Sequence, residues 1–313
     1  MASARVHTAP MVPADDGAAV EVGGDDFRCA AWTAAGGFDP IGSATTFDRL
    51  VTVEVPGPWP ADVADLEWIA ALDVPPGTRV QAIVPESGRS DGTVLLTKWE
   101  RAAGTLIGVD CLVTADDVPR TLAALANGGE PDAECTEAPP EILVCSHGTR
   151  DRCCGGPGTR LAVETRARLP EMRVRRTSHL GGHRFAPTAL TLPDGRMWAF
   201  LDADVLAGIV RRDLPAGEAR EFYRGNVALD PWAQTVEGDV LEECGWSTVD
   251  FDEVTATSEV DGDRAAVGLA WTSGGVIDER SAVVEIADRY PVLQCGLAPS
   301  EAKKSSPEYR VVG

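Results

Sequence analysis

The sequence has little positive charge. Only three of its 313 residues are lysine, and 28 lysines and arginines face 49 aspartates and glutamates, which gives a formal net charge of −21. A chain of this charge repels nucleic-acid phosphates and anionic lipid head groups. We therefore expect neither nucleic acid nor a membrane as a partner.

Long apolar runs are also lacking. No stretch approaches the roughly 18 apolar residues that a bilayer-spanning helix needs. The first residues are acidic and polar, and they do not follow the basic-then-apolar pattern of a secretion signal. These features predict a soluble, cytoplasmic protein.

Cysteine is sparse and unevenly placed. Eight cysteines in 313 residues are too few for a disulfide-stapled secreted scaffold, so thiols or metal ligands are expected. Three of them, at 145, 153 and 154, fall within ten residues. The others have no partner at a metal-site spacing, and we expect them to be buried or inert thiols: Cys29, Cys111, Cys135, Cys244 and Cys295.

The hydrophobic pattern divides the chain into two similar halves. Residues 27–128 predict strands and helices in the order β-α-β-β-β-α, and residues 141–225 repeat that order. The acidic, proline-rich stretch at 129–140 indicates a linker. Sheets faced by helices in this order predict an α/β fold, with two thioredoxin-like units in tandem. Between residues 40 and 128 there is one cysteine and no histidine, so the first unit should bind no metal group.

The two ends of the chain carry other patterns. Residues 1–26 are rich in alanine, glycine, aspartate and proline without a period, which predicts a disordered leader. Residues 226–300 predict a helix followed by three strands of a small antiparallel β module. Residues 301–313 show no pattern, and we expect a tail.

Chemistry is concentrated in two segments. The first is C-S-H-G-T-R-D-R-C-C-G-G at 145–156, and the second is S-H-L-G-G-H at 178–183. Both follow predicted strands, and such junctions meet at one end of an α/β sheet. The glycines between the two histidines of the second segment let the backbone turn so that both imidazoles face inward. The segments therefore predict a shared site.

Two thiols and two imidazoles suit either zinc or an iron–sulfur cluster. Zinc sites usually take cysteines with about two to four residues between them, whereas Cys145 and Cys154 are nine residues apart. The long loop favours a two-iron cluster, although zinc also binds H-x3-H pairs. A third alternative is a thioredoxin-like thiol oxidoreductase whose nucleophile is Cys145, Cys153 or Cys154. The lack of a C-x-x-C motif speaks against that alternative.

The same segments, C-S-H-G-T-R-D-R-C-C-G and S-H-L-G-G-H-R-F-A-P, resemble those of the sucrase/ferredoxin-like family. A weaker similarity includes P-I-G-S-A at 40–44 and V-E-V-P-G-P-W-P at 53–60, so the resemblance covers most of residues 27–225. It implies a thioredoxin-like [2Fe–2S] ferredoxin. The protein would then be an electron carrier for a reductase or an oxidase, rather than an enzyme with its own substrate.

The resemblance also implies a ligand set. By position, the cluster ligands are Cys145, Cys154, His179 and His183. Cys153 is the alternative to Cys154, but the cysteine directly before glycine fits the family pattern better.

Further residues are expected to surround the ligands. Arg150 and Asp151 should pair and hold the loop, and His147 could form a hydrogen bond or relay a proton. Arg184 could offset local negative charge. Pro187 stands where thioredoxin-like proteins often carry a cis proline.

Overall fold

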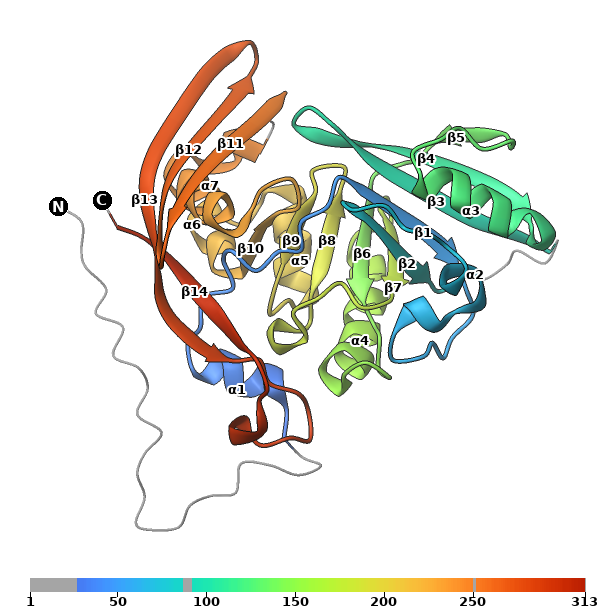
Figure 1. The fold of residues 1–313 in the computed structure, drawn as a ribbon, viewed down its shortest axis with the longest axis horizontal. Coiled ribbons are helices and arrows are strands. Elements are labelled where there is room, and N and C mark those ends of the chain that lie inside the picture. Colours follow the sequence, from blue (N-terminus) through green and yellow to red (C-terminus); the bar gives the residue numbers. More distant parts are fainter. Residues whose placement is uncertain (1–26, 87–91, 250–251, 313) are drawn as a thin grey trace.

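The computed structural model describes residues 27–86, 92–249 and 252–312 (Figure 1). The leader expected at 1–26 lies outside the described residues. The described chain is a mixed α/β protein with one ten-stranded sheet and a separate four-stranded antiparallel sheet, so the α/β class is confirmed. Among the described residues, none of the helices has the length and apolarity that a bilayer crossing requires.

The first half of the large sheet consists of strands rich in β-branched residues, which favour this conformation. Val51 and Val53 are fully buried, and Leu122 of an amphipathic helix packs in the same core. In chain order the main elements are α1 (Cys29–Ala35), β1 (Arg49–Glu54), α2 (Glu67–Ala70), β2 (Thr78–Ile83), β3 (Thr93–Ala102), β4 (Thr105–Thr114), α3 (Val118–Ala126) and β5 (Cys135–Glu137).

The second half is built in the same way. Ile142 and Val144 are fully buried and pack with Leu161 of the long helix that follows them. In chain order the main elements are β6 (Glu141–Cys145), α4 (Arg152–Arg168), β7 (Arg173–Thr177), β8 (Ala189–Leu192), β9 (Arg196–Trp198), α5 (Ala203–Arg211), α6 (Ala216–Ala219), β10 (Tyr223–Asn226) and α7 (Pro231–Cys244).

The two halves form one continuous sheet. Its strand order is β10-β9-β8-β6-β7-β2-β1-β3-β4-β5. Each half has a parallel pair at its centre, β1 with β2 and β6 with β7. The halves join where β2 meets β7 in antiparallel orientation, at Ile83 and Thr177. The sheet therefore repeats one strand order on either side of the junction, and both halves contain the predicted chain order β-α-β-β-β-α.

A buried polar network ties the halves together. The Glu141 carboxylate in β6 accepts a hydrogen bond from Trp99 Nε1 in β3 at 2.6 Å. It also pairs with Arg175 at 2.6 Å and Arg173 at 3.1 Å, both in β7. Glu141 is fully buried, and a buried charge is stable only when it is paired and hydrogen-bonded. Strands from both halves therefore share one charged network.

The expected linker contains a strand, and a disulfide corrects the expectation for two cysteines. Strand β5 lies within 129–140 and pairs with β4, with Cys135 opposite Cys111. The two residues form a disulfide, and their Cα atoms are 4.4 Å apart. The expectation that both are inert thiols is wrong, because strand pairing brings together residues that the spacing keeps apart.

The C-terminal sheet has four strands, and the described part of the expected tail supplies one of them. The strands are β11 (Glu253–Asp261), β12 (Arg264–Ser273), β13 (Val276–Pro291) and β14 (Ser305–Val311). Val236 and Val240 of α7 pack against Leu269 and Val284 of this sheet. The expectation of a patternless tail is wrong for 305–311, because β14 pairs along β13.

Two segments that are far apart in the sequence reach the same place. Helix α1 and the segment between β13 and β14 lie side by side, close to the start of α4 (Figure 1). Cys29 of α1 and Leu293 of that segment belong to the core that also holds Cys145 and Cys154. Helix α1 and the segment between β13 and β14 therefore cover the region where the two Cys/His segments meet.

Candidate metal centre

The end of β6 and the start of α4 position two cysteines. Cys145 is the last residue of β6, and α4 begins at Arg152. The Asp151 side chain caps α4 by accepting the Cys153 N–H at 2.8 Å. Cys153 and Cys154 therefore lie in the first turn of α4, where free N–H groups and the helix dipole favour thiolates.

Gly158 allows this close arrangement. A Cβ atom at Gly158 would lie 1.8 Å from the carbonyl oxygen of Cys145. Because glycine has no side chain, the first turns of α4 can pack directly on the end of β6. This contact brings Cys154 next to Cys145.

Buried polar side chains hold the histidine loop. Gly181 and Gly182 have φ angles of 94° and 70°, which glycine adopts without strain. The Arg224 guanidinium donates to the Gly181 carbonyl at 3.1 Å. Arg79 and Gln81 each donate to the His179 carbonyl at 3.3 Å. The loop after β7 is therefore held by β10, through Arg224, and by β2, through Arg79 and Gln81.

Three of the four expected ligands come together. The ligand atoms of Cys145, Cys154 and His179 all lie within 4.8 Å of one another. His179 Nδ1 is 3.9 Å from Cys145 Sγ and 3.8 Å from Cys154 Sγ. Both cysteines are buried and His179 is partly exposed. We call these three residues the first group.

His183 lies at the edge of the first group. Its ring centroid is 5.7 Å from that of His179. Its Nδ1 is 3.3 Å from Asp151 Oδ2 and 3.4 Å from Cys29 Sγ. A carboxylate on one ring nitrogen of a metal-binding histidine is a common arrangement, and it leaves the other nitrogen as the donor. Nε2 is thus the atom with which His183 could join the first group.

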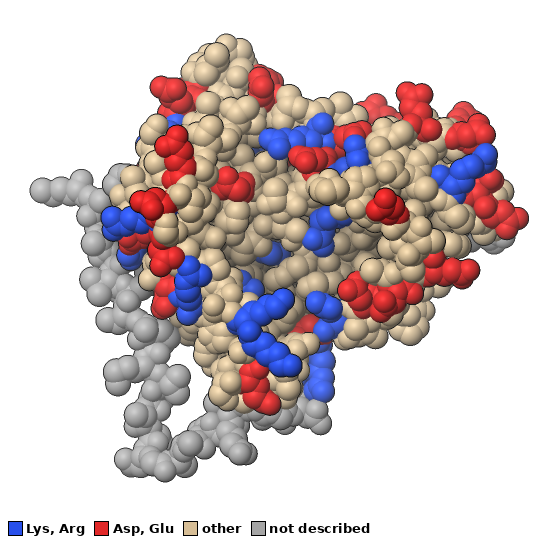
Figure 2. All heavy atoms as spheres, viewed as in Figure 1, with Lys and Arg blue, Asp and Glu red and all other residues tan. Residues whose placement is uncertain are grey.

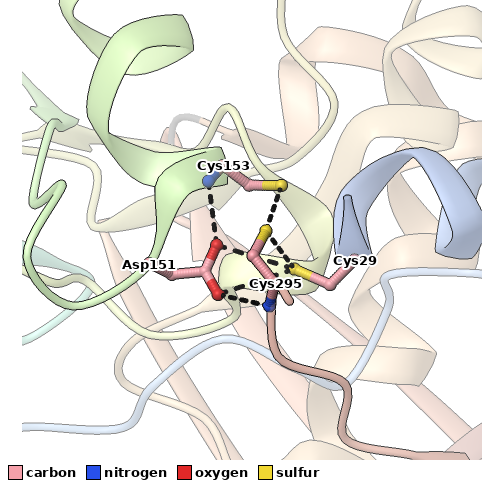
Figure 3. Close-up of side chains that lie close together, drawn as sticks. All are labelled: Cys29, Asp151, Cys153 and Cys295. Atoms are coloured by element: carbon pink, nitrogen blue, oxygen red, sulfur yellow. Dashed lines mark hydrogen bonds between the residues drawn. The ribbon is translucent and has the colours of Figure 1, made fainter. Parts of the chain in front are cut away.

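Cys153 lies elsewhere, although it is next to Cys154 in sequence. Its Sγ is 3.1 Å from Cys295 Sγ, which in turn is 3.7 Å from Cys29 Sγ. The ligand atoms of these three cysteines and Asp151 all lie within 4.8 Å of one another (Figure 3). We call these four residues the second group.

The expectation that Cys29 and Cys295 have no metal-spaced partners is wrong. Cys29 and Cys295 are 266 residues apart in sequence. Their spacing therefore carried no signal, and only the packing of α1 against the segment between β13 and β14 brings them together. Of the thiols expected to be inert, the structure leaves Cys244 free and exposed.

Each thiol of the first group shifts the pKa of the other. A hydrogen bond from Cys154 lowers the pKa of Cys145 and raises the pKa of Cys154 itself, and His179 lowers the pKa of Cys145 further. A metal ion would bind both side chains as thiolates and so displace any proton that they carry.

Two arginines, Arg224 buried and Arg79 partly exposed, bring positive charge close to these thiols. Burial, followed by the charge of Arg184, lowers the pKa of Arg224 to about 9, while the charges of Cys145 and Cys154 oppose this shift. Burial lowers the pKa of Arg79, and the charge of Cys145 again opposes it. The positive charges therefore favour negative charge on the first group.

His147 holds the backbone of His179. Its Nδ1 accepts the His179 N–H at 3.1 Å, so Nε2 carries the ring proton and donates to the Pro60 carbonyl at 2.7 Å. Burial lowers the pKa of His147. The expected hydrogen bond is confirmed, and with both nitrogens bound to backbone groups the ring is a positioning residue rather than a proton relay.

The expected pairing of Arg150 with Asp151 is wrong. Asp151 turns inward as the α4 cap, and its side chain is 1% exposed. Although burial raises the pKa of Asp151, the hydrogen bonds from His183 and from the Cys295 N–H hold it well below its usual range. Arg150 is exposed, and it donates to the Ala61 carbonyl at 3.5 Å.

Two further expectations concern residues beside the loop. The Ala186–Pro187 bond is cis, as expected. Arg184 is buried, lies over the rings of Phe185 and Tyr290, and donates to Ser306 at 2.7 Å. Burial lowers the pKa of Arg184, against an opposing effect from Tyr290 and the charge of Cys29.

The imidazoles, unlike the thiols of the first group, border open pockets. His179 lines a pocket of about 290 Å³ and His183 lines one of about 320 Å³. The second pocket also has Arg150, Lys303 and Lys304 in its walls. On the face drawn in Figure 2, basic side chains gather in the lower middle, whereas acidic ones are spread over the right and the top. The site is therefore buried on its sulfur side and accessible on its histidine side.

The fold and the first group define a mixed α/β protein with cysteine and histidine side chains that could hold a metal. The family model described as sucrase/ferredoxin-like matches residues 40–225, and the chain belongs to that family. The match includes the whole first group, but not Cys29, Cys295 or the C-terminal sheet. No curated protein and no solved structure matches the chain significantly.

Proposed function

We propose that this protein transfers electrons through a [2Fe–2S] cluster held by Cys145, Cys154, His179 and His183. The observation that carries the proposal is the buried first group, which lies within the matched family region. We assign a thioredoxin-like architecture to both halves, because they share one strand order.

The donor set fits such a cluster electrically. Two ferric ions and two sulfides carry a charge of about +2, and two thiolates reduce it to about zero, whereas four thiolates would leave about −2. A neutral centre costs less to bury than a charged one. The surroundings of Cys145 and Cys154 are apolar on the sulfur side and positively charged at Arg224 and Arg79.

When bound, the cluster would supply reversible one-electron chemistry. The protein sets the conditions for it. Arg224 and Arg79 favour the added negative charge of the reduced state, which raises the potential. His179 directs Nδ1 at the thiols and borders a pocket, so a proton on its Nε2 can exchange with water. Electron uptake and proton uptake would then be coupled at this ring.

The histidine side is the proposed route for electrons. It is the accessible side, and the pocket beside His183 carries Arg150, Lys303 and Lys304. A redox partner, a reductase or an oxidase, would dock there with an acidic patch, because complementary charge speeds association. We also propose a cytoplasmic location. The Cys111–Cys135 disulfide argues against it, because disulfides are rare in the reducing cytosol.

The test is the visible spectrum of anaerobically purified protein, with iron and acid-labile sulfide counted on the same sample. We expect a red-brown protein with about two irons and two sulfides per chain. Cys145→Ser and Cys154→Ser should lose the colour, and the exposed Cys244→Ser control should keep it. His179→Cys should keep the iron and shift the bands.

Other results would overturn the proposal. A colourless protein whose zinc disappears in Cys145→Ser would make the first group a zinc-stabilised binding module. A protein with no metal and a reactive thiol at Cys145 or Cys154 would point to a thiol oxidoreductase.

A further inference from the structure

The second group is assembled from three distant parts of the chain. Cys29 is the first residue of α1, Asp151 and Cys153 lie at the start of α4, and Cys295 lies between β13 and β14. In Figure 3 the four side chains point toward one another. Cys29 and Cys295 lie outside the matched region 40–225, so the family resemblance does not account for this group.

The separations within the second group match one metal ion. Zinc–sulfur bonds of about 2.3 Å at tetrahedral angles place two sulfurs about 3.8 Å apart. Cys29 Sγ lies 3.7 Å from Cys295 Sγ and 3.7 Å from Asp151 Oδ1. Cys153 Sγ lies 3.1 Å from Cys295 Sγ, which is short for this geometry but well beyond a disulfide bond of about 2.0 Å.

The donors are also buried enough to hold an ion. Cys29 is 0% exposed, Cys153 is 5% exposed, and the Asp151 side chain is 1% exposed. Asp151 keeps an oxygen available. Its Oδ2 accepts the Cys295 N–H at 3.1 Å and faces His183 Nδ1. Among the described residues, Oδ1 accepts one N–H group, that of Cys153, at 2.8 Å. One lone pair of Oδ1 is thus free to face the sulfurs.

We propose that Cys29, Cys153, Cys295 and Asp151 bind one zinc ion, at a second metal site separate from the first group. Three soft thiolates and one carboxylate form a closed four-ligand set of the kind that structural zinc uses. The site fastens α1 and the C-terminal segment to the start of α4. Asp151 also contacts His183. The zinc ion therefore fixes the Asp151 carboxylate, the N-cap of α4, next to the first group.

The test is the metal content of the full-length protein, with zinc, iron and sulfide measured together. We expect about one zinc per chain in the natural protein. Zinc should fall below about a tenth of that in Cys29→Ser and in Cys295→Ser. It should stay in the Cys244→Ser control and in Cys145→Ser. Because Cys145→Ser removes only the proposed cluster, failure of the proposed function and failure of this site give different results.

A second measurement does not depend on how the variants fold. Zinc-edge X-ray absorption of the natural protein should show three sulfurs at about 2.3 Å and one oxygen at about 2.0–2.2 Å.

Cys295 is partly exposed in a segment without a helix or strand around it, so Cys295→His should fold and should keep zinc.

Three results would overturn the inference. The first is the absence of zinc from the natural protein. The second is zinc with two sulfur ligands that leaves in Cys145→Ser, since it would belong to the first group. The third is a Cys153–Cys295 disulfide, found by mass spectrometry after thiol alkylation of protein purified without oxygen.

Discussion

The contact between α4 and β6 predicts opposite effects for two glycines of one helix. Alanine at Gly158 would place its Cβ 1.8 Å from the Cys145 carbonyl oxygen, whereas the Cβ of alanine at Gly156 would have no atom within 4 Å beyond its chain neighbours and the nearby backbone of its own helix. Alanine favours a helix over glycine by about 1 kcal/mol. Helix propensity alone would therefore stabilise both variants.

Steric clash decides the outcome for Gly158→Ala. Real Cβ atoms essentially never lie within 3.0 Å of such an atom, so the start of α4 and the end of β6 must move apart by more than about 1 Å. Metal–ligand distances tolerate errors of only about 0.2 Å. Because Cys145 and Cys154 lie on the two sides of this contact, the shift separates them by far more than a cluster or a zinc ion allows.

The assay is metal content and thermal unfolding of Gly158→Ala and Gly156→Ala, prepared side by side. Gly158→Ala should lose the metal of the first group and about 1–3 kcal/mol of stability or more, as overpacked cores do. Gly156→Ala should keep the metal and unfold at the same temperature or slightly above. Equal metal content in the two variants would refute the reasoning.

Three further predictions concern the potential and the disulfide. Arg224→Gln removes a buried positive charge and should lower the reduction potential by about 60 mV, the one-electron equivalent of about 1.4 kcal/mol; redox titration would contradict this with an unchanged or higher value. The potential should fall by up to about 59 mV per pH unit as pH rises, since proton uptake at His179 favours the reduced state, and a flat potential between about pH 6 and about pH 10 would disprove the coupling. Cys135→Ser opens a loop with a sequence separation of 24 and should cost about 3.5 kcal/mol in urea unfolding; a variant as stable as the parent would show that the Cys111 crosslink is not formed.

The sequence could predict what depends on local pattern. The strands β1 to β4 and β6 to β9 alternate or are short apolar runs, and each was recognisable as a strand. Cys145 ends β6, Cys154 lies in the helix that follows it, and His179 lies just after β7. Because both strands end at the same edge of the sheet, the meeting of these residues was foreseeable. The family match, over residues 40–225, includes the same segments.

Contacts between distant parts of the chain were not predictable. Cys29 and Cys295 meet only because α1 and the segment after β13 pack on the same core. Strand β14, S-S-P-E-Y-R-V, has few apolar residues and is stabilised by pairing with β13 at the edge of the small sheet. Strand β5 has three residues in an acidic stretch, so Cys135 gave no sign of its partner. Such elements depend on their neighbours rather than on their own sequence.

The repeated sheet has a consequence for the number of electrons that the protein can carry. Counted from the junction of Ile83 with Thr177, Glu54 in β1 occupies the position that Cys145 occupies in β6. Glu54 is buried, and its carboxylate accepts the N–H groups of Glu86 and Leu95 at 3.2 and 3.0 Å. The first half thus repeats the strand order of the second half, with a carboxylate that accepts two main-chain N–H groups in place of the thiolate. Under the proposed function, each molecule holds a single electron, and a donor that releases electrons in pairs must meet two molecules, or the same molecule twice.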